Sequence, residues 1–100
     1  MTGLIVIHRA LPGQRAALID AWTRHMPAAI AANPGHVAYS YGFGDDPDSI
    51  VAVQIYRSVT DAEAFLHTEA YRAYLDASRH LLARDPELIR FVPHWIKDRA

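Results

Sequence analysis

Four stretches of the chain group apolar residues in the way that β-strands do. Residues 4–10 are a run rich in Leu, Ile and Val, and residues 36–43 alternate bulky side chains with small ones. Residues 50–57 form a third apolar run behind a turn-forming GDDPDS sequence, which predicts an antiparallel hairpin with the second run. The fourth candidate strand, residues 88–96, contains Pro93, which cannot donate to a ladder, so part of this strand is expected at an edge or a bulge.

Two other stretches have the spacing of amphipathic helices. From residue 14 to about residue 32, apolar side chains recur every four positions until an Asn-Pro-Gly sequence ends the pattern. A second helical pattern begins after Ser58 or Thr60, either of which can cap it, and runs to Leu82 with a break expected near His67.

The resulting order, β-α-β-β-α-β, predicts an α+β fold of the ferredoxin-like class over one domain, residues 1–100. In this fold a four-stranded antiparallel sheet carries its helices on one face. The first and third strands are apolar on both faces, however, so the second face also needs a cover. We expect a second copy of the sheet to provide it in a homodimer, fastened by Phe91 and Trp95 of the last strand. The residues expected to face the partner are Ile5, Ile7, Val51, Val53 and Ile55.

Composition and charge exclude several classes of protein. The formal net charge is −1 and the basic residues are scattered, so the sequence lacks the clustered positive charge that binds nucleic-acid phosphates. It has no cysteine, which excludes disulfides, thiolate metal sites and cysteine nucleophiles. The N-terminus lacks a basic leader, and no apolar run is long enough to span a membrane. We therefore expect a cytoplasmic protein without nucleic-acid or membrane partners.

Three segments carry a family resemblance: LPGQ at 11–14, AANPGHVAYSY at 31–41 and VQIYRSVTDAEAFLHTEAYRAY at 53–74. The last of these contains an aromatic-x-Ser step, an Ala-Phe pair and an acidic-x-aromatic step, namely Tyr56-Arg57-Ser58, Ala64-Phe65 and Glu69-Ala70-Tyr71. In these features the chain resembles the antibiotic biosynthesis monooxygenase family of the dimeric α+β-barrel superfamily. The resemblance covers nearly the whole chain.

The resemblance implies a cofactor-independent monooxygenase that oxidises a small aromatic, phenol or quinol-like metabolite with dioxygen. A haem-degrading branch of the superfamily uses an Asn, a Trp and a His at positions that correspond here to His8, Tyr56 and Leu75. Because leucine cannot ligate iron, haem degradation is disfavoured. No cofactor is expected, because the resemblance implies a cofactor-independent reaction. The alternative is a small-molecule binding or sensing dimer without catalysis, and a third interpretation is a structural dimer with no ligand.

The candidate site lies where the helix-facing side of the sheet meets the helices. His8 and Tyr56 share this side and are the predicted catalytic residues, with His8 as the base and Tyr56 as an orienting group. A histidine needs no function to be there, and His8 is equally compatible with a ring that is half in water at a strand end. The predicted substrate-binding residues, several of which also suit the core, are Trp22, His25, Tyr39, Gln54, Phe65 and Tyr71.

No metal site is expected from the sequence. His36, His80 and His94 are scattered, and no histidine pair has the i,i+4 spacing of helical metal ligands. The acidic residues at 45–48 resemble part of a calcium loop, but the glycine and the final glutamate of that motif are missing, so a solvated turn is favoured.

Overall fold

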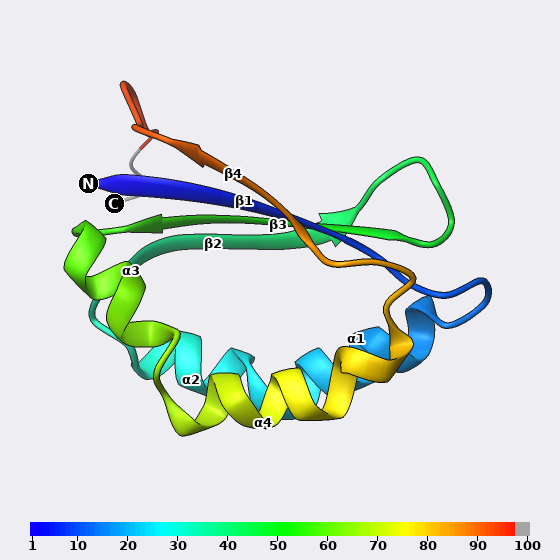
Figure 1. The fold of residues 1–100 in the computed structure, drawn as a ribbon. Helices are drawn as coiled ribbons and strands as arrows, with labels where there is room; N and C mark the ends of the chain where they lie inside the picture. Colours follow the sequence, from blue (N-terminus) through cyan, green and yellow to red (C-terminus); the bar gives the residue numbers. More distant parts are fainter. Residues whose placement is uncertain (98–100) are drawn as a thin grey trace.

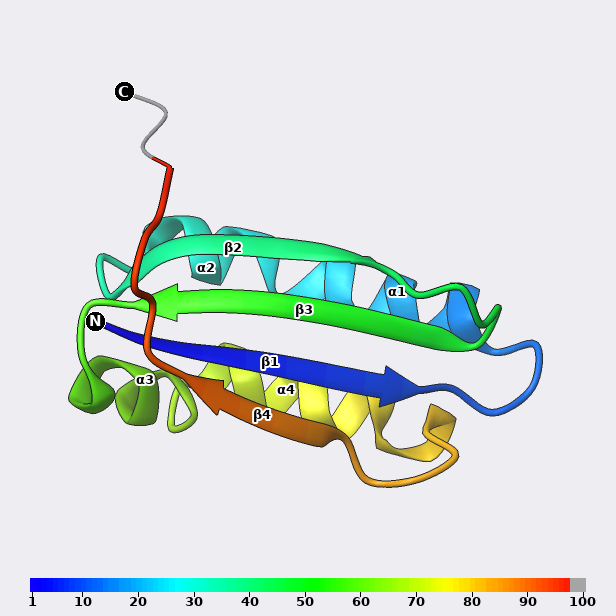
Figure 2. The same ribbon diagram turned by 90° about the horizontal axis from the view of Figure 1, so that it is seen from above.

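A computed structural model describes residues 1–97 of the protein. Strands β1 (Thr2–Arg9), β2 (His36–Phe43), β3 (Ser49–Tyr56) and β4 (Glu87–Phe91) form one antiparallel sheet in the order β2-β3-β1-β4 (Figure 2). The helices lie on one side of it (Figure 1): α1 (Arg15–His25), α2 (Pro27–Ala32), α3 (Val59–Phe65), α4 (Glu69–Ser78) and the short 3-10 turn η1 (Arg79–Leu81). The ferredoxin-like α+β class predicted from the element order is confirmed.

The first helical region is divided, and the prediction of one continuous helix from residue 14 to 32 was wrong. Helix α1 closes with the Met26 amide donating to the Trp22 carbonyl at 2.8 Å, and α2 begins at Pro27. Proline has no amide hydrogen, and its ring clashes with the preceding turn, so it starts a helix more readily than it continues one.

The second helical region breaks where the sequence indicates. Helix α3 ends at Phe65 and α4 starts at Glu69. Of the two candidate caps Ser58 is the one used, because its hydroxyl accepts a hydrogen bond from the Asp61 amide at 3.1 Å. The hydroxyl of Thr68 caps α4 in the same way, by accepting from the Tyr71 amide.

The register of the central strands fixes which residues face the helices. Leu4 pairs with Gln54 and His8 pairs with Ile50, and side chains of paired residues point to the same face of an antiparallel sheet. The alternate residues, such as Ile5, which pairs with Val53, and Ile7, which pairs with Val51, point to the outer face. The division of the two faces predicted from alternation is confirmed.

Strand β2 departs from its predicted alternation at one point. His36 pairs with Tyr56 while Ala38 pairs with Ile55, so Val37 is the extra residue of a β-bulge. Val37 is 45% exposed, and the bulge gives the helix-facing position to His36 instead. Strict alternation over residues 36–43 would put Val37 on the same face as Tyr39, and this expectation was wrong, because an inserted residue reverses the alternation on one side of it.

Strand β4 is the edge strand next to β1 and is shorter than predicted, because it ends at Phe91, two residues before Pro93. The ring of Phe91 lies directly on Gly3, where it fills the space of a missing side chain on the outer face. The chain then crosses the ends of β1 and β3 on that face (Figure 2), and Trp95 is 77% exposed.

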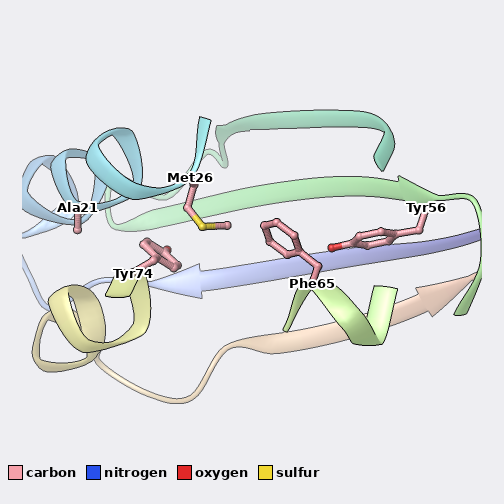
Figure 3. Close-up of a cluster of buried hydrophobic side chains, with 5 residues drawn as sticks. All are labelled: Ala21, Met26, Tyr56, Phe65 and Tyr74. Atoms are coloured by element: carbon pink, nitrogen blue, oxygen red, sulfur yellow. The ribbon is translucent and has the colours of Figure 1, made fainter. Parts of the chain in front are cut away.

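The core lies between the sheet and the helices in two clusters. One contains Ala10, Leu18 and Ile50. The other, drawn in Figure 3, brings Tyr56 of β3 toward Phe65 of α3, with its hydroxyl pointing at the Phe65 ring and Met26 beyond it. This second cluster forms part of the wall of a cavity.

Candidate functional site

A cavity of about 290 Å³ lies between the helix-facing side of the sheet and the helices. Its volume suits one small aromatic molecule. Seven of the eight predicted site residues line it: His8, Trp22, Tyr39, Gln54, Tyr56, Phe65 and Tyr71. The eighth, His25, is half-buried at the end of α1 and is not among the lining residues. The fold thus brings together residues that come from β1, β2, β3, α1, α3 and α4.

The imidazole of His8 belongs to the wall of this cavity. Its ring stands edge-on to that of Tyr74, with the centroids 6.5 Å apart. Burial lowers the pKa of His8 below its ordinary value, so the ring is neutral at pH 7. Its Nδ1 is sealed from solvent and has no hydrogen-bond partner among residues 1–97, whereas Nε2 is not sealed. A molecule in the cavity can therefore reach His8 only through Nε2.

A chain of hydrogen-bonded polar groups runs from Asn33 through His36 to Gln54 and Tyr56, the two members that line the cavity. Asn33 contacts His36 Nδ1 through its Nδ2 at 2.8 Å, and His36 Nε2 lies 3.3 Å from Gln54 Oε1. The hydroxyl of Tyr56 donates to the same Gln54 oxygen at 2.5 Å. The His36 ring is also packed against the ring of Tyr56, with centroids 4.3 Å apart, and edge-on to Phe65 at 4.6 Å.

The sequence alone gave no reason to select His36. Plain alternation along β2 puts it on the opposite face from Tyr39, and only the bulge at Val37 brings it to the inner face. Burial lowers the pKa of His36, and the hydrogen bond to Gln54 partly opposes that effect. The neutral form of this ring is thus the one that the folded protein favours.

Tyr56 keeps its proton in this arrangement. Burial raises the pKa of its hydroxyl well above the ordinary value, and the hydrogen bond to Gln54 holds the hydrogen in place. Tyr56 is therefore suited to orienting Gln54 and not to accepting a proton.

Aromatic side chains form the wall nearest to α1. Trp22 stacks on Tyr41 with centroids 4.0 Å apart, and its indole N–H donates to the Tyr39 hydroxyl at 3.3 Å. Phe65 and Tyr71 continue the wall along α3 and α4, with centroids 6.0 Å apart. These flat faces suit a flat, apolar ring.

Two charged residues that sequence reasoning did not select also line the cavity. Glu63 lies on α3 and Arg90 on β4, and both are exposed. Arg90 faces inward because it pairs with Leu4 across the edge of the sheet. The inward direction of Arg90 could have been predicted from alternation along the last strand, because Leu88 and Arg90 share one face.

Over residues 1–97, no three His, Cys, Asp or Glu side chains are grouped in a way that would hold a metal ion. The acidic turn has a structural task, because Asp46 accepts hydrogen bonds from Arg9 and from the Asp48 amide. None of the helices in the described part of the chain is long and apolar enough to cross a membrane.

Comparisons with known proteins agree with this architecture. No curated protein gives a significant match. Among solved structures, a candidate antibiotic biosynthesis monooxygenase from Nitrosomonas europaea superposes with a TM-score of 0.88 at 22% identity, covering 95% of this chain and 100% of that one. Another from Chloroflexus aurantiacus gives a TM-score of 0.83 at 28% identity, covering 99% and 98%. A second Nitrosomonas europaea protein, described as of unknown function, gives 0.84 at 23% identity, covering 99% and 94%.

A match in sequence, and not only the shared fold, assigns the chain to a family. The family model for antibiotic biosynthesis monooxygenases matches residues 1–77, which hold β1 to β3, α1 to α3 and most of α4. This match includes every cavity residue from Leu4 to Leu75, and it leaves out Ser78, Leu82, Pro86, Leu88 and Arg90. The chain belongs to the antibiotic biosynthesis monooxygenase family.

Proposed function

We propose that the protein is a cofactor-independent monooxygenase that oxidises a small phenol or quinol-like metabolite with dioxygen. The observation that carries the proposal is the aromatic-walled cavity with a half-buried, neutral histidine in its wall. Family membership supports the same class of reaction. The proposed reaction needs no cofactor, because the substrate itself supplies the electrons.

In the proposed reaction His8 Nε2 accepts the phenol proton, with the other ring proton held at Nδ1. The phenolate passes one electron to dioxygen, and the resulting radical pair combines to form a carbon–oxygen bond. The peroxide then loses water: one oxygen atom stays on the ring, the other leaves as water, and the ring becomes a quinone. A cavity that excludes bulk water protects such intermediates from side reactions.

The separation of the polar groups favours a substrate with oxygens at opposite ends. Gln54 pairs with Leu4, and His8 lies four residues further along β1, which is about 13 Å at the rise of a strand. Side chains whose backbone positions are so far apart are more readily contacted by two oxygen atoms of one ligand than by a single oxygen atom. A quinol-like ring, with one hydroxyl at His8 and a second oxygen at Gln54, spans the gap better than a simple phenol.

A second candidate function is binding or sensing of a small aromatic molecule without catalysis. It is favoured by one observation: the Nδ1 of His8 has no partner among residues 1–97. A catalytic histidine is normally oriented by a hydrogen bond at its second nitrogen, and this one is not. We expect a sensor to bind quinols and release them unchanged under oxygen.

We further propose that the protein is a homodimer through the outer face of its sheet. Ile5, Ile7, Val51, Val53 and Ile55 share that face, and the adjoining Ile89 is 41% exposed. Apart from Glu87 and Arg9 at one end of the sheet, the paired positions of this face carry no charge, so most of the face is complementary to itself in a twofold arrangement. A face of this kind buries about 800 Å² per partner in a stable dimer. The cytoplasmic location stays a prediction from the sequence.

Oxygen uptake with a panel of phenols, hydroquinones and naphthoquinols tests the oxygenase. We expect turnover that falls at least about a hundredfold in His8→Gln, the scale of a lost general base. His67→Gln, which removes an exposed histidine outside the cavity, serves as the matched control and should keep full activity. Turnover no faster than buffer, or an active His8→Gln variant, would rule out the proposed mechanism.

A further inference from the structure

The direction of the Gln54 amide follows from a chain of hydrogen bonds that starts at the backbone. The Gly35 amide can only donate, and it donates to the Asn33 side chain at 3.2 Å, so that atom is Oδ1. The Asn33 Nδ2 is then the atom that faces His36 Nδ1 at 2.8 Å. Because Nδ2 is a donor, His36 Nδ1 carries no proton and accepts.

The remaining proton of the neutral His36 ring is consequently on Nε2. This nitrogen donates to Gln54 across 3.3 Å, so the Gln54 atom facing it is the acceptor Oε1. The Tyr56 hydroxyl donates to the same oxygen at 2.5 Å. Two donors from two strands thus hold one end of the Gln54 amide, and the other end, Nε2, must point away from both.

The amide nitrogen of Gln54 is open to the cavity. Gln54 is only 7% exposed and lines the cavity, yet its Nε2 has no acceptor in residues 1–97. It is also not among the buried atoms that are sealed without a partner, which are His8 Nδ1, Tyr41 Oη and Tyr74 Oη. A polar N–H in an apolar cavity gains free energy when an acceptor pairs with it.

We infer that Gln54 presents a fixed N–H donor to the cavity, that His36 is the positioning residue that holds it there, and that the cavity selects ligands with an acceptor oxygen. The oxygen is a phenolate or a quinone or ketone carbonyl. This inference rests on the proposed function for the aromatic nature of the ligand, but not for any turnover. A hydrogen-bond donor at a developing phenolate also stabilises it during oxidation.

The first test concerns the free protein. Nitrogen-15 spectra of the histidine rings distinguish the two neutral tautomers, and we expect His36 to carry its proton on Nε2 at pH 7.5. A proton on Nδ1 would overturn the inference, because Gln54 would then have to turn its nitrogen toward His36.

The second test uses 2,4-dichlorophenol, whose single oxygen and ultraviolet absorbance report its ionisation. In Gln54→Met we expect the preference for bound phenolate over bound phenol to fall about tenfold to a hundredfold, the effect of one hydrogen bond to a charge. In His36→Phe, which keeps the ring but frees the amide to turn, we expect a smaller fall of about threefold to tenfold. His67→Gln is the control and should match the wild type.

The outcomes separate this inference from the proposed oxygenase. An unchanged preference in both variants, or no binding of 2,4-dichlorophenol, overturns the inference. If Gln54→Met fails to fold, His36→Phe and the tautomer of the wild type still decide it. If the protein binds the phenolate in preference to the phenol but takes up no oxygen, the inference is supported and the proposed oxygenase function is contradicted.

Discussion

Trp22 stacks on Tyr41 with ring centroids 4.0 Å apart, while its indole N–H is directed to a different tyrosine, Tyr39. The two tyrosines are two residues apart on β2 and face the same side of the sheet, but only the Tyr39 hydroxyl takes part in a hydrogen bond. The Tyr41 hydroxyl is sealed from solvent without a partner among residues 1–97. Neighbouring, chemically identical groups thus differ in what they contribute to stability.

This difference predicts opposite effects of the same substitution. Tyr41→Phe removes an unpaired buried hydroxyl while keeping the stack, so the free energy of unfolding should stay equal or rise by about 1 kcal/mol. Tyr39→Phe leaves the Trp22 N–H without its acceptor and should lower the free energy of unfolding by about 0.5–1.5 kcal/mol. Urea unfolding at pH 7.5 measures both, and a more stable Tyr39→Phe than Tyr41→Phe would contradict this account.

Stability should decrease as the solution is acidified through the histidine range. Burial lowers the pKa of both His8 and His36 below 6.5 in the folded protein. The unfolded chain therefore binds protons that the folded protein does not, so stability is complete above about pH 6.5 and is lost as pH falls through the folded pKa values. Thermal melts between pH 5 and 8 should show this slope.

The pH dependence of stability should arise from the imidazole rings of His8 and His36. His8→Gln and His36→Gln should each flatten it, while His80→Gln, at an exposed position on η1, should leave it unchanged. A slope that survives in the double variant His8→Gln/His36→Gln would assign the effect to other groups.

A charge on the outer face of the sheet tests the proposed homodimer. Val53→Lys puts an ammonium group at the centre of that face, where a partner sheet would have to bury it, and we expect a monomer by light scattering at micromolar concentration. Val59→Lys, at an exposed valine at the start of α3 on the helix side of the sheet, is the matched control and should remain dimeric. A wild-type monomer, or a dimer that tolerates Val53→Lys, would contradict the assignment.

Gly3 should be intolerant of any side chain while Phe91 is present. A Cβ at residue 3 would overlap the Phe91 ring, whereas at Gly42, another strand glycine, nothing lies within 4 Å. We expect Gly3→Ala to lower the free energy of unfolding by about 1–3 kcal/mol, as overpacking does. Gly42→Ala should change it by less than about 0.5 kcal/mol. Adding Phe91→Leu should recover part of the loss at Gly3, and no recovery would place the strain elsewhere.

The sequence by itself determined the element order, the class of fold and the two faces of the central strands. These follow from local periodicity, which the tertiary structure leaves intact when, as in β1 and β3, alternation is unbroken. It also placed the break between α3 and α4 near His67. For the same reason it selected His8, Gln54 and Tyr56 as residues of one face.

Only the tertiary structure decided what depends on a local irregularity or on contacts between distant elements. The bulge at Val37 turns His36 inward, and strict alternation hides it because one extra residue reverses every side chain on that side. Pro27 divides the first helical region, and His25, at the end of α1, lies outside the cavity wall. The direction of the Gln54 amide depends on donors from residues 18 and 2 positions away, meeting across two strands. Hydrogen bonds between strands are set by register, and register is a property of the folded sheet rather than of any one segment.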